Sequence, residues 1–113
     1  MNEDLVIIFV FIFVGALEIV MGIPLMYEKI KPNWFYGFRL PKTVSNKDIW
    51  YKVNKKTGKD LVLSGIIVVI LSLTLLFLNL NIDIVVLVII QVFVLMALLA
   101  IIIAHGLLLI KEY

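Results

Sequence analysis

The sequence contains no cysteine and only one histidine, and these two absences remove several classes of site. Without cysteine the chain has no disulfide framework, no thiolate metal site and no cysteine nucleophile. A metal bound by His105 would lack the companion ligands that it needs. The sequence also shows no nucleophile–base pair, phosphate-binding loop or paired carboxylates. We therefore expect no enzyme activity, no cofactor and no metal.

Charge is also sparse, because 64% of the 113 residues are hydrophobic and only 16% are charged. The mean hydropathy is +1.17. A soluble domain is usually about half apolar, and a chain this short could not hide so much apolar surface in one core. Lipid accepts such a surface, so the composition predicts an all-α integral membrane protein.

Three apolar segments reach the roughly 20 residues that a helix needs to cross a bilayer. They cover residues 5–26, 61–80 and 84–110. The first follows an acidic flank, whereas a signal peptide begins with a basic one, so we expect a retained helix. The polar turn Asn81–Asp83 makes the last two segments an antiparallel hairpin. We predict one membrane domain over residues 1–113, a three-helix bundle with an interfacial cytoplasmic loop and helix between its first two spans.

The basic residues gather in that connecting segment, residues 27–60, which holds nine Lys and Arg against three acids, a net charge of +6. The opposite side carries Glu3, Asp4 and Asp83 and no basic residue. Basic loops stay cytoplasmic, so we predict a multi-pass protein of the cell membrane with its N-terminus outside and its C-terminus in the cytoplasm. We expect the loop to attract anionic lipid headgroups rather than nucleic acid.

Small residues recur at seven-residue spacing on each predicted span, and such residues let helices approach closely in lipid. The pairs are Gly15 and Gly22, Gly65 and Ser72, and Ala97 and Ala104 with Ala100 beside them. We predict a left-handed bundle that packs through these three stripes.

Three polar residues interrupt the apolar spans: Glu18, Gln91 and His105. A carboxyl group inside the bilayer is costly unless it is paired or neutral, which makes Glu18 the strongest functional candidate on physical grounds. It would pair with Arg39, contact His105, or stay protonated and hydrogen-bonded within the bundle. Gln91 and His105 share one helical face, and we expect that face to meet a second copy of the chain.

The loop segment Lys31–Lys42 reads KPNWFYGFRLPK, and its prolines prevent a continuous helix. Its aromatic rings should settle at the headgroup level, with the segment lying flat in the inner interface or folding back beneath the bundle. Gly37 permits a tight turn. Arg39 would either anchor the loop to phosphate or fix it by bonding to backbone carbonyls or Glu18.

A helix is expected to start at about residue 46, with Ser45 as its N-cap and Asp48 completing a capping box. The spacing of four between Trp50, Asn54 and Gly58 places them on one face. If Gly58 ended this helix, it would lie on the membrane as a separate piece. Because the face stays in register with Gly65 and Ser72, we favour a helix that is continuous with the second span or bends into it. Asn54 is expected to bond across to the loop.

At these positions the chain resembles the SdpI-like membrane proteins, over roughly residues 25–69. The residues that carry the resemblance are Asn33, Trp34, Tyr36, Gly37, Arg39, Pro41, Thr43, Trp50, Asn54 and Gly58. The best-known member of that family gives immunity to a secreted peptide toxin and sequesters a transcriptional repressor at the membrane. The resemblance implies a protein that protects against or senses a membrane-active peptide toxin, with the toxin or a repressor as its partner.

Two other functions remain open from the residues alone. The first is a small transporter or channel, formed by several copies, that uses Glu18 with Gln91 and His105. The second is an accessory membrane anchor that holds a cytoplasmic partner through the basic loop.

Overall fold

The computed structural model of the chain describes residues 2–78 and 81–113. The helices in these residues are α1 (Glu3–Met26), α2 (Pro41–Val44), α3 (Lys47–Leu78) and α4 (Ile84–Ile110). Three of them, α1, α3 and α4, are long and apolar enough to cross a membrane. The prediction of an all-α protein with three spans is confirmed, and the predicted end of the second span, residue 80, lies outside the described residues.

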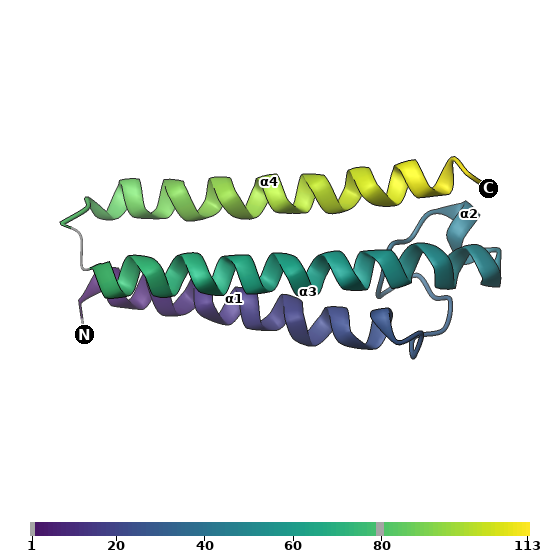
Figure 1. Cartoon of the computed structure of the whole chain (residues 1–113), viewed down its shortest axis with the longest axis horizontal. Helices are drawn as coiled ribbons and strands as arrows, with labels where there is room; N and C mark the ends of the chain where they lie inside the picture. Colours follow the sequence, from purple (N-terminus) through teal and green to yellow (C-terminus); the bar gives the residue numbers. More distant parts are fainter. Residues whose placement is uncertain (1, 79–80) are drawn as a thin grey trace.

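The three long helices run along one axis and form a bundle of 50 × 23 × 19 Å. Figure 1 shows that the N-terminus and the C-terminus lie at opposite ends of this bundle. Helix α3 packs against both α1 and α4, whereas α1 and α4 touch each other little. Helix α3 is therefore the central helix of the bundle, and α1 and α4 flank it.

Helix α1 is closed at both ends by specific hydrogen bonds. The side chain of Asn2 accepts from the backbone N–H of Leu5 at 2.9 Å, as an N-cap does. At the other end, Lys29 N–H donates to the Pro24 carbonyl at 2.9 Å while Glu28 has a positive φ of 59°. This is a Schellman motif with a glutamate at the position where glycine is usual, and it turns the chain sharply out of the helix.

Helix α3 is continuous over 32 residues, about 48 Å at 1.5 Å per residue, against a hydrocarbon core of roughly 30 Å. Its first turns therefore project beyond the membrane, and the prediction of continuity through Gly58 is confirmed. The predicted N-cap is wrong by one residue. The side chain of Asn46 accepts from the N–H groups of Asp48 and Ile49 at 3.0 and 3.2 Å, whereas Ser45 ends the short helix α2.

Helices α1 and α3 meet backbone to backbone at two pairs of glycines. A Cβ atom added to Gly15 would lie 2.8 Å from the carbonyl oxygen of Gly65, and one added to Gly22 would lie 2.6 Å from that of Gly58. The predicted stripe on α1 is therefore confirmed. On α3, Gly58 and Gly65 pack against α1, whereas Ser72 of the predicted stripe bonds to Gln91 of α4.

The predicted stripe on α4 is wrong, because Ala97, Ala100 and Ala104 are all exposed. The buried residues of this helix include Leu87, Gln91, Ile102 and Gly106. Two contacts fix that rotation: Gln91 bonds to Ser72 of α3, and Gly106 receives the ring of Phe38 from the loop.

Candidate functional site

The loop between α1 and α2 is held in shape by Asn33. Its side-chain oxygen accepts from the N–H groups of Phe35 and Tyr36 at 2.8 and 2.7 Å, and its side-chain amide donates to the Lys31 carbonyl at 2.7 Å. An asparagine that bonds to nearby backbone in this way imposes a turn without regular secondary structure. Phe35 stands at the tip of this turn, 89% exposed, where an aromatic ring can enter the headgroup layer.

The next residues fold back against the bundle and contact both α1 and α4. The Tyr36 hydroxyl donates to the Met21 carbonyl of α1, and the Phe38 ring packs on Gly106 of α4. Burial raises the pKa of the Tyr36 phenol, so the hydroxyl keeps the proton that it donates. Of the two expected courses of the loop, the structure has the one that folds back against the bundle.

Gly37 makes this return possible for two reasons. Its φ is +113°, in a region that side-chain-bearing residues avoid, and a Cβ atom there would lie 2.6 Å from the Asn54 side-chain oxygen. The expected tight turn at Gly37 is confirmed.

Asn54 of α3 joins the folded loop to the bundle. Its side-chain oxygen accepts from the Phe38 N–H at 2.5 Å, and its amide lies 3.1 Å from the Trp50 carbonyl and 3.4 Å from the Phe38 carbonyl. One turn earlier, the Trp50 indole N–H donates to the Ile30 carbonyl at 2.8 Å. Trp50 is fully buried and Asn54 is 2% exposed, so these bonds are shielded from water. The expectation that Asn54 reaches across to the loop is confirmed.

Thr43 and Pro41 end the loop. The Thr43 hydroxyl accepts from the Leu40 N–H at 2.8 Å and lies within 3.0 Å of the Phe38 and Leu40 carbonyls, to one of which it donates. Pro41 occupies the first turn of α2, where its missing N–H costs no hydrogen bond. The residues Asn33, Tyr36, Gly37, Pro41, Thr43, Trp50 and Asn54 are thus brought together as one structural unit, while Gly58 lies further along α3 against Gly22.

Arg39 stabilises the loop from its exposed side. One guanidinium N–H donates to the Trp34 carbonyl at 3.2 Å, which confirms the expected bond to a backbone carbonyl. The alternative pairing with Glu18 does not form. Within residues 2–78 and 81–113, neither carboxylate oxygen of Glu18 has a hydrogen-bond partner.

Glu18 is 8% exposed and lies in the seam between α1 and α3, beside the similarly unpartnered hydroxyl of Ser64. It points at α3 because it follows Gly15 by one turn on the buried face of α1. The alternative contact with His105 is also absent, since His105 bonds elsewhere. Glu18 is therefore a buried carboxyl group, and the hydrogen bond expected of a protonated Glu18 within the bundle is not formed in the described residues either.

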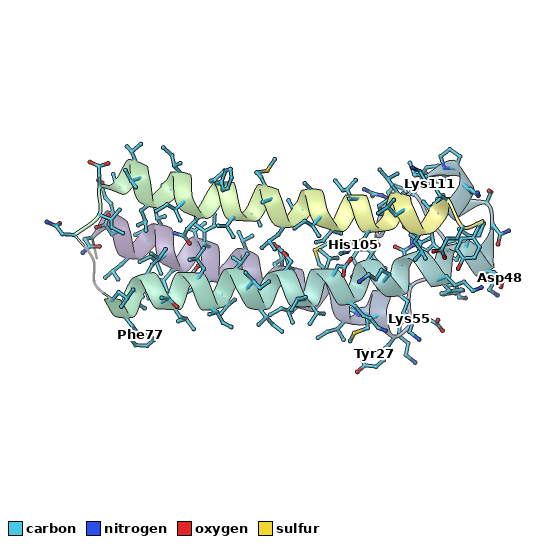
Figure 2. The ribbon with its side chains drawn as sticks, turned by 45° about the horizontal axis from the view of Figure 1, so that its top comes forward. Tyr27, Asp48, Lys55, Phe77, His105 and Lys111 are labelled. Atoms are coloured by element: carbon cyan, nitrogen blue, oxygen red, sulfur yellow. The ribbon has the colours of Figure 1, made fainter. Side chains whose placement is uncertain are left out.

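His105 contacts an acid that the sequence did not single out. Its Nδ1 lies 2.8 Å from a carboxylate oxygen of Asp60, and the other oxygen of Asp60 lies 2.9 Å from the Lys56 ammonium. In Figure 2, His105 lies along α4 away from the tip that carries Lys111. Asp60 is the last charged residue before the apolar part of α3. That position in the sequence, at a depth similar to that of His105, could have predicted the contact between the two residues.

Gln91 is 2% exposed, and its side-chain oxygen accepts from the Ser72 hydroxyl of α3 at 2.9 Å. The part of this face of α4 that carries Gln91 is therefore turned toward α3, while the His105 side chain is 43% exposed, and contact of this face with a second copy of the chain stays a prediction.

A cavity of about 250 Å³ lies where the folded loop meets the spanning helices. Its walls come from all four parts of the fold, namely Met21 and Leu25 of α1, residues 35–39 of the loop, Thr57 and Leu61 of α3, and Ile102 of α4. The described residues include no group of three or more His, Cys, Asp and Glu side chains that could hold a metal ion. The arrangement offers a binding surface for an apolar ligand near the membrane interface.

Comparison with known proteins gives one match. A model of the SdpI/YfhL protein family matches residues 29–107, which include the loop, α2, α3 and most of α4. The match extends through the third span, beyond the residues that carry the resemblance in the sequence. Neither the curated proteins nor the solved structures include a chain that matches.

Proposed function

Because the chain belongs to the SdpI/YfhL protein family, we propose that this multi-pass membrane protein protects against, or senses, a membrane-active peptide toxin. The role is binding rather than catalysis. The observation that carries the proposal is the docking of the loop on all three long helices. The motif residues Tyr36 and Asn54 hold it on α1 and α3, and Phe38, which lies within the motif, packs on α4. A peptide that enters between the spans would move this loop, and the movement would be readable from the basic cytoplasmic side.

The test is survival of a toxin-sensitive cell that expresses this chain under toxin challenge. We expect protection by the wild type and its loss in Gly37→Val, which the positive φ and the nearby Asn54 oxygen make incompatible with the folded loop. Ser45→Val is the matched control, because Ser45 is exposed and ends α2. Absence of protection by the wild type, with membrane insertion confirmed, would contradict the proposal.

The proposed orientation places the N-terminus outside and the C-terminus in the cytoplasm. Asp48, Lys55 and Lys111 lie at one end of the bundle in Figure 2, and the positive-inside rule assigns that basic end to the cytoplasm. Since the sequence has no cysteine, Lys55→Cys carries a unique thiol. A membrane-impermeant maleimide should label it only after the cells are permeabilised. Labelling of intact cells would show the opposite orientation and contradict this proposal.

A second candidate function, an ion or proton pathway through an oligomer, is favoured by the unpartnered carboxyl group of Glu18. Ionisable groups inside a membrane often mark such pathways. Flux in reconstituted vesicles that Glu18→Gln abolishes would support this candidate. Equal flux in vesicles with and without the reconstituted protein would exclude it.

A further inference from the structure

The cavity between the loop and the spans is lined mainly by apolar side chains. These come from all three long helices and from the loop: Met21, Leu25, Phe38, Leu61 and Ile102. It lies at the inner end of the apolar part of the bundle, because Leu61 is the first residue of the apolar half of α3. An occupant must therefore present hydrocarbon to these walls at the depth where acyl chains meet headgroups.

One wall of the cavity carries a hydroxyl group without a partner. Thr57 is 6% exposed, and its Oγ1 has no hydrogen bond within the described residues. Ser64 of the same helix is likewise without a partner in the described residues, whereas the Ser72 and Thr74 hydroxyls each lie 2.8 Å from the carbonyl oxygen four residues earlier. The Thr57 oxygen is covered by protein atoms, so a ligand in the cavity that Thr57 lines would reach this unused donor on rotation of the Thr57 side chain.

The rim of the cavity carries a cation. Arg39 is exposed, it has five N–H donors, and the structure uses one of them on the Trp34 carbonyl. The acidic side chains of the described residues make their ion pairs elsewhere, at Asp60. Trp34 and Phe35 beside it are 56% and 89% exposed, and such rings settle at the headgroup level. The guanidinium is thus placed where lipid phosphates lie.

We propose that this cavity is a specific site for one anionic glycerophospholipid of the inner leaflet. Its phosphate would sit on Arg39, an ester carbonyl would accept from the Thr57 hydroxyl, and one acyl chain would pass between Met21, Leu61 and Ile102. Basic pockets between spans on the cytoplasmic side recognise anionic headgroups in this way. The net charge of +6 in residues 27–60 favours an anionic over a zwitterionic lipid. The site does not depend on peptide protection, because its ligand is a component of the resting membrane.

Native mass spectrometry of the full chain tests this proposal. The purified protein is exposed to equal amounts of phosphatidylglycerol and phosphatidylcholine, and the bound lipids are counted. We expect one retained phosphatidylglycerol. Arg39→Gln should lower its retention about tenfold, since charge-assisted hydrogen bonds to the phosphate are lost. Lys47→Gln is the matched control, because it removes the same charge from an exposed lysine outside the cavity and should change nothing.

Two further variants keep the test sharp if Arg39→Gln disturbs the loop. Ile102→Phe should obstruct the passage of the acyl chain between Met21, Leu61 and residue 102 and so lower retention strongly, while Thr57→Val should lower it about threefold by removing one hydrogen bond. Helix content by circular dichroism should stay at the wild-type level in both. Equal retention of the two lipids by the wild type, or unchanged retention in Ile102→Phe, would overturn the proposal. Binding of a hydrophobic peptide, with neither lipid retained, would also overturn the proposal, because the cavity would then be a peptide site.

Discussion

The two seams of the bundle are built in different ways. Between α1 and α3, the glycine pairs Gly15 with Gly65 and Gly22 with Gly58 bring the backbones into contact. Between α3 and α4, the described contacts include two polar side-chain pairs, Gln91 with Ser72 and His105 with Asp60. The first seam depends on shape along its length, whereas the second depends on a few attachment points and on the loop wedged beside it. The seams should therefore respond differently to substitution.

The largest effect is expected in the glycine seam. A Cβ atom at Gly58 already meets the Gly22 carbonyl at 2.6 Å, so Gly58→Val must push α1 away from α3. We expect a loss of about 3 kcal/mol in the free energy of unfolding, at the upper end for overpacking. Titration with a denaturing detergent, followed by the fluorescence of Trp50, would measure it. Ala16→Val adds comparable volume on the exposed face of α1 and should change little.

The loop comes next, because it contacts α1 through Tyr36 and α4 through Phe38 and is held on α3 by Asn54. Asn54→Leu keeps the side-chain size but leaves the Phe38 N–H without its partner. We expect a loss of about 2 kcal/mol, the penalty for an unsatisfied buried group. Hydrogen exchange should rise at residues 33–40 and stay slow in α1. Asn81→Leu, at an exposed site in the turn before α4, serves as the control, and equal exchange in both variants would contradict the role of Asn54.

A smaller effect is expected at the contact between His105 of α4 and Asp60 of α3. His105→Gln weakens the contact with Asp60, which lies 2.8 Å from Nδ1. Because the His105 side chain is 43% exposed and Lys56 still neutralises Asp60, we expect a loss of only about 1 kcal/mol. A double-mutant cycle with Asp60→Asn would isolate the coupling. Additive effects of the two single changes would show that the pair contributes nothing.

The sequence predicted the elements well and the rotation of α4 badly. Lengths and ends follow from hydropathy and turn residues, so the third span is found at residues 84–110, as expected. Helix α4, however, is apolar on every face, so hydrophobic periodicity carries no information about which side turns inward. The alanine stripe was the available local signal. The rotation is set instead by Gln91 and Gly106, whose partners Ser72 and Phe38 lie far away in the chain.

The candidate site was predictable where its contacts are local or repeat along one face. Gly37 and the Trp50–Asn54 spacing indicated a turn and a docking face, and both are present. The isolation of Glu18 and the partner of His105 were not predictable, because both depend on how neighbouring helices are rotated. His105 and Asp60 are 45 residues apart in sequence. The cavity likewise needs four segments in place before it exists.

The smallest effect is expected at the remaining polar pair, deep between α3 and α4. Gln91 accepts from Ser72 at 2.9 Å, but its own amide nitrogen has no partner in the described residues. Gln91→Leu removes one hydrogen bond and at the same time one unsatisfied buried group, and these changes oppose each other. Hydrogen bonds between spans contribute about 0.6 kcal/mol on average, so the net change should be smaller than that.

Ser72→Ala sharpens this prediction, because it leaves the whole Gln91 side chain without a partner. It should destabilise the bundle more than Gln91→Leu does, although it removes fewer atoms. Both variants would be measured by the same detergent titration, with Thr74→Ala as the control, since Thr74 bonds only within its own helix in the described structure. If Gln91→Leu were the more damaging change, the α3–α4 seam would depend on shape as the glycine seam does. The contrast between the two seams would then be lost.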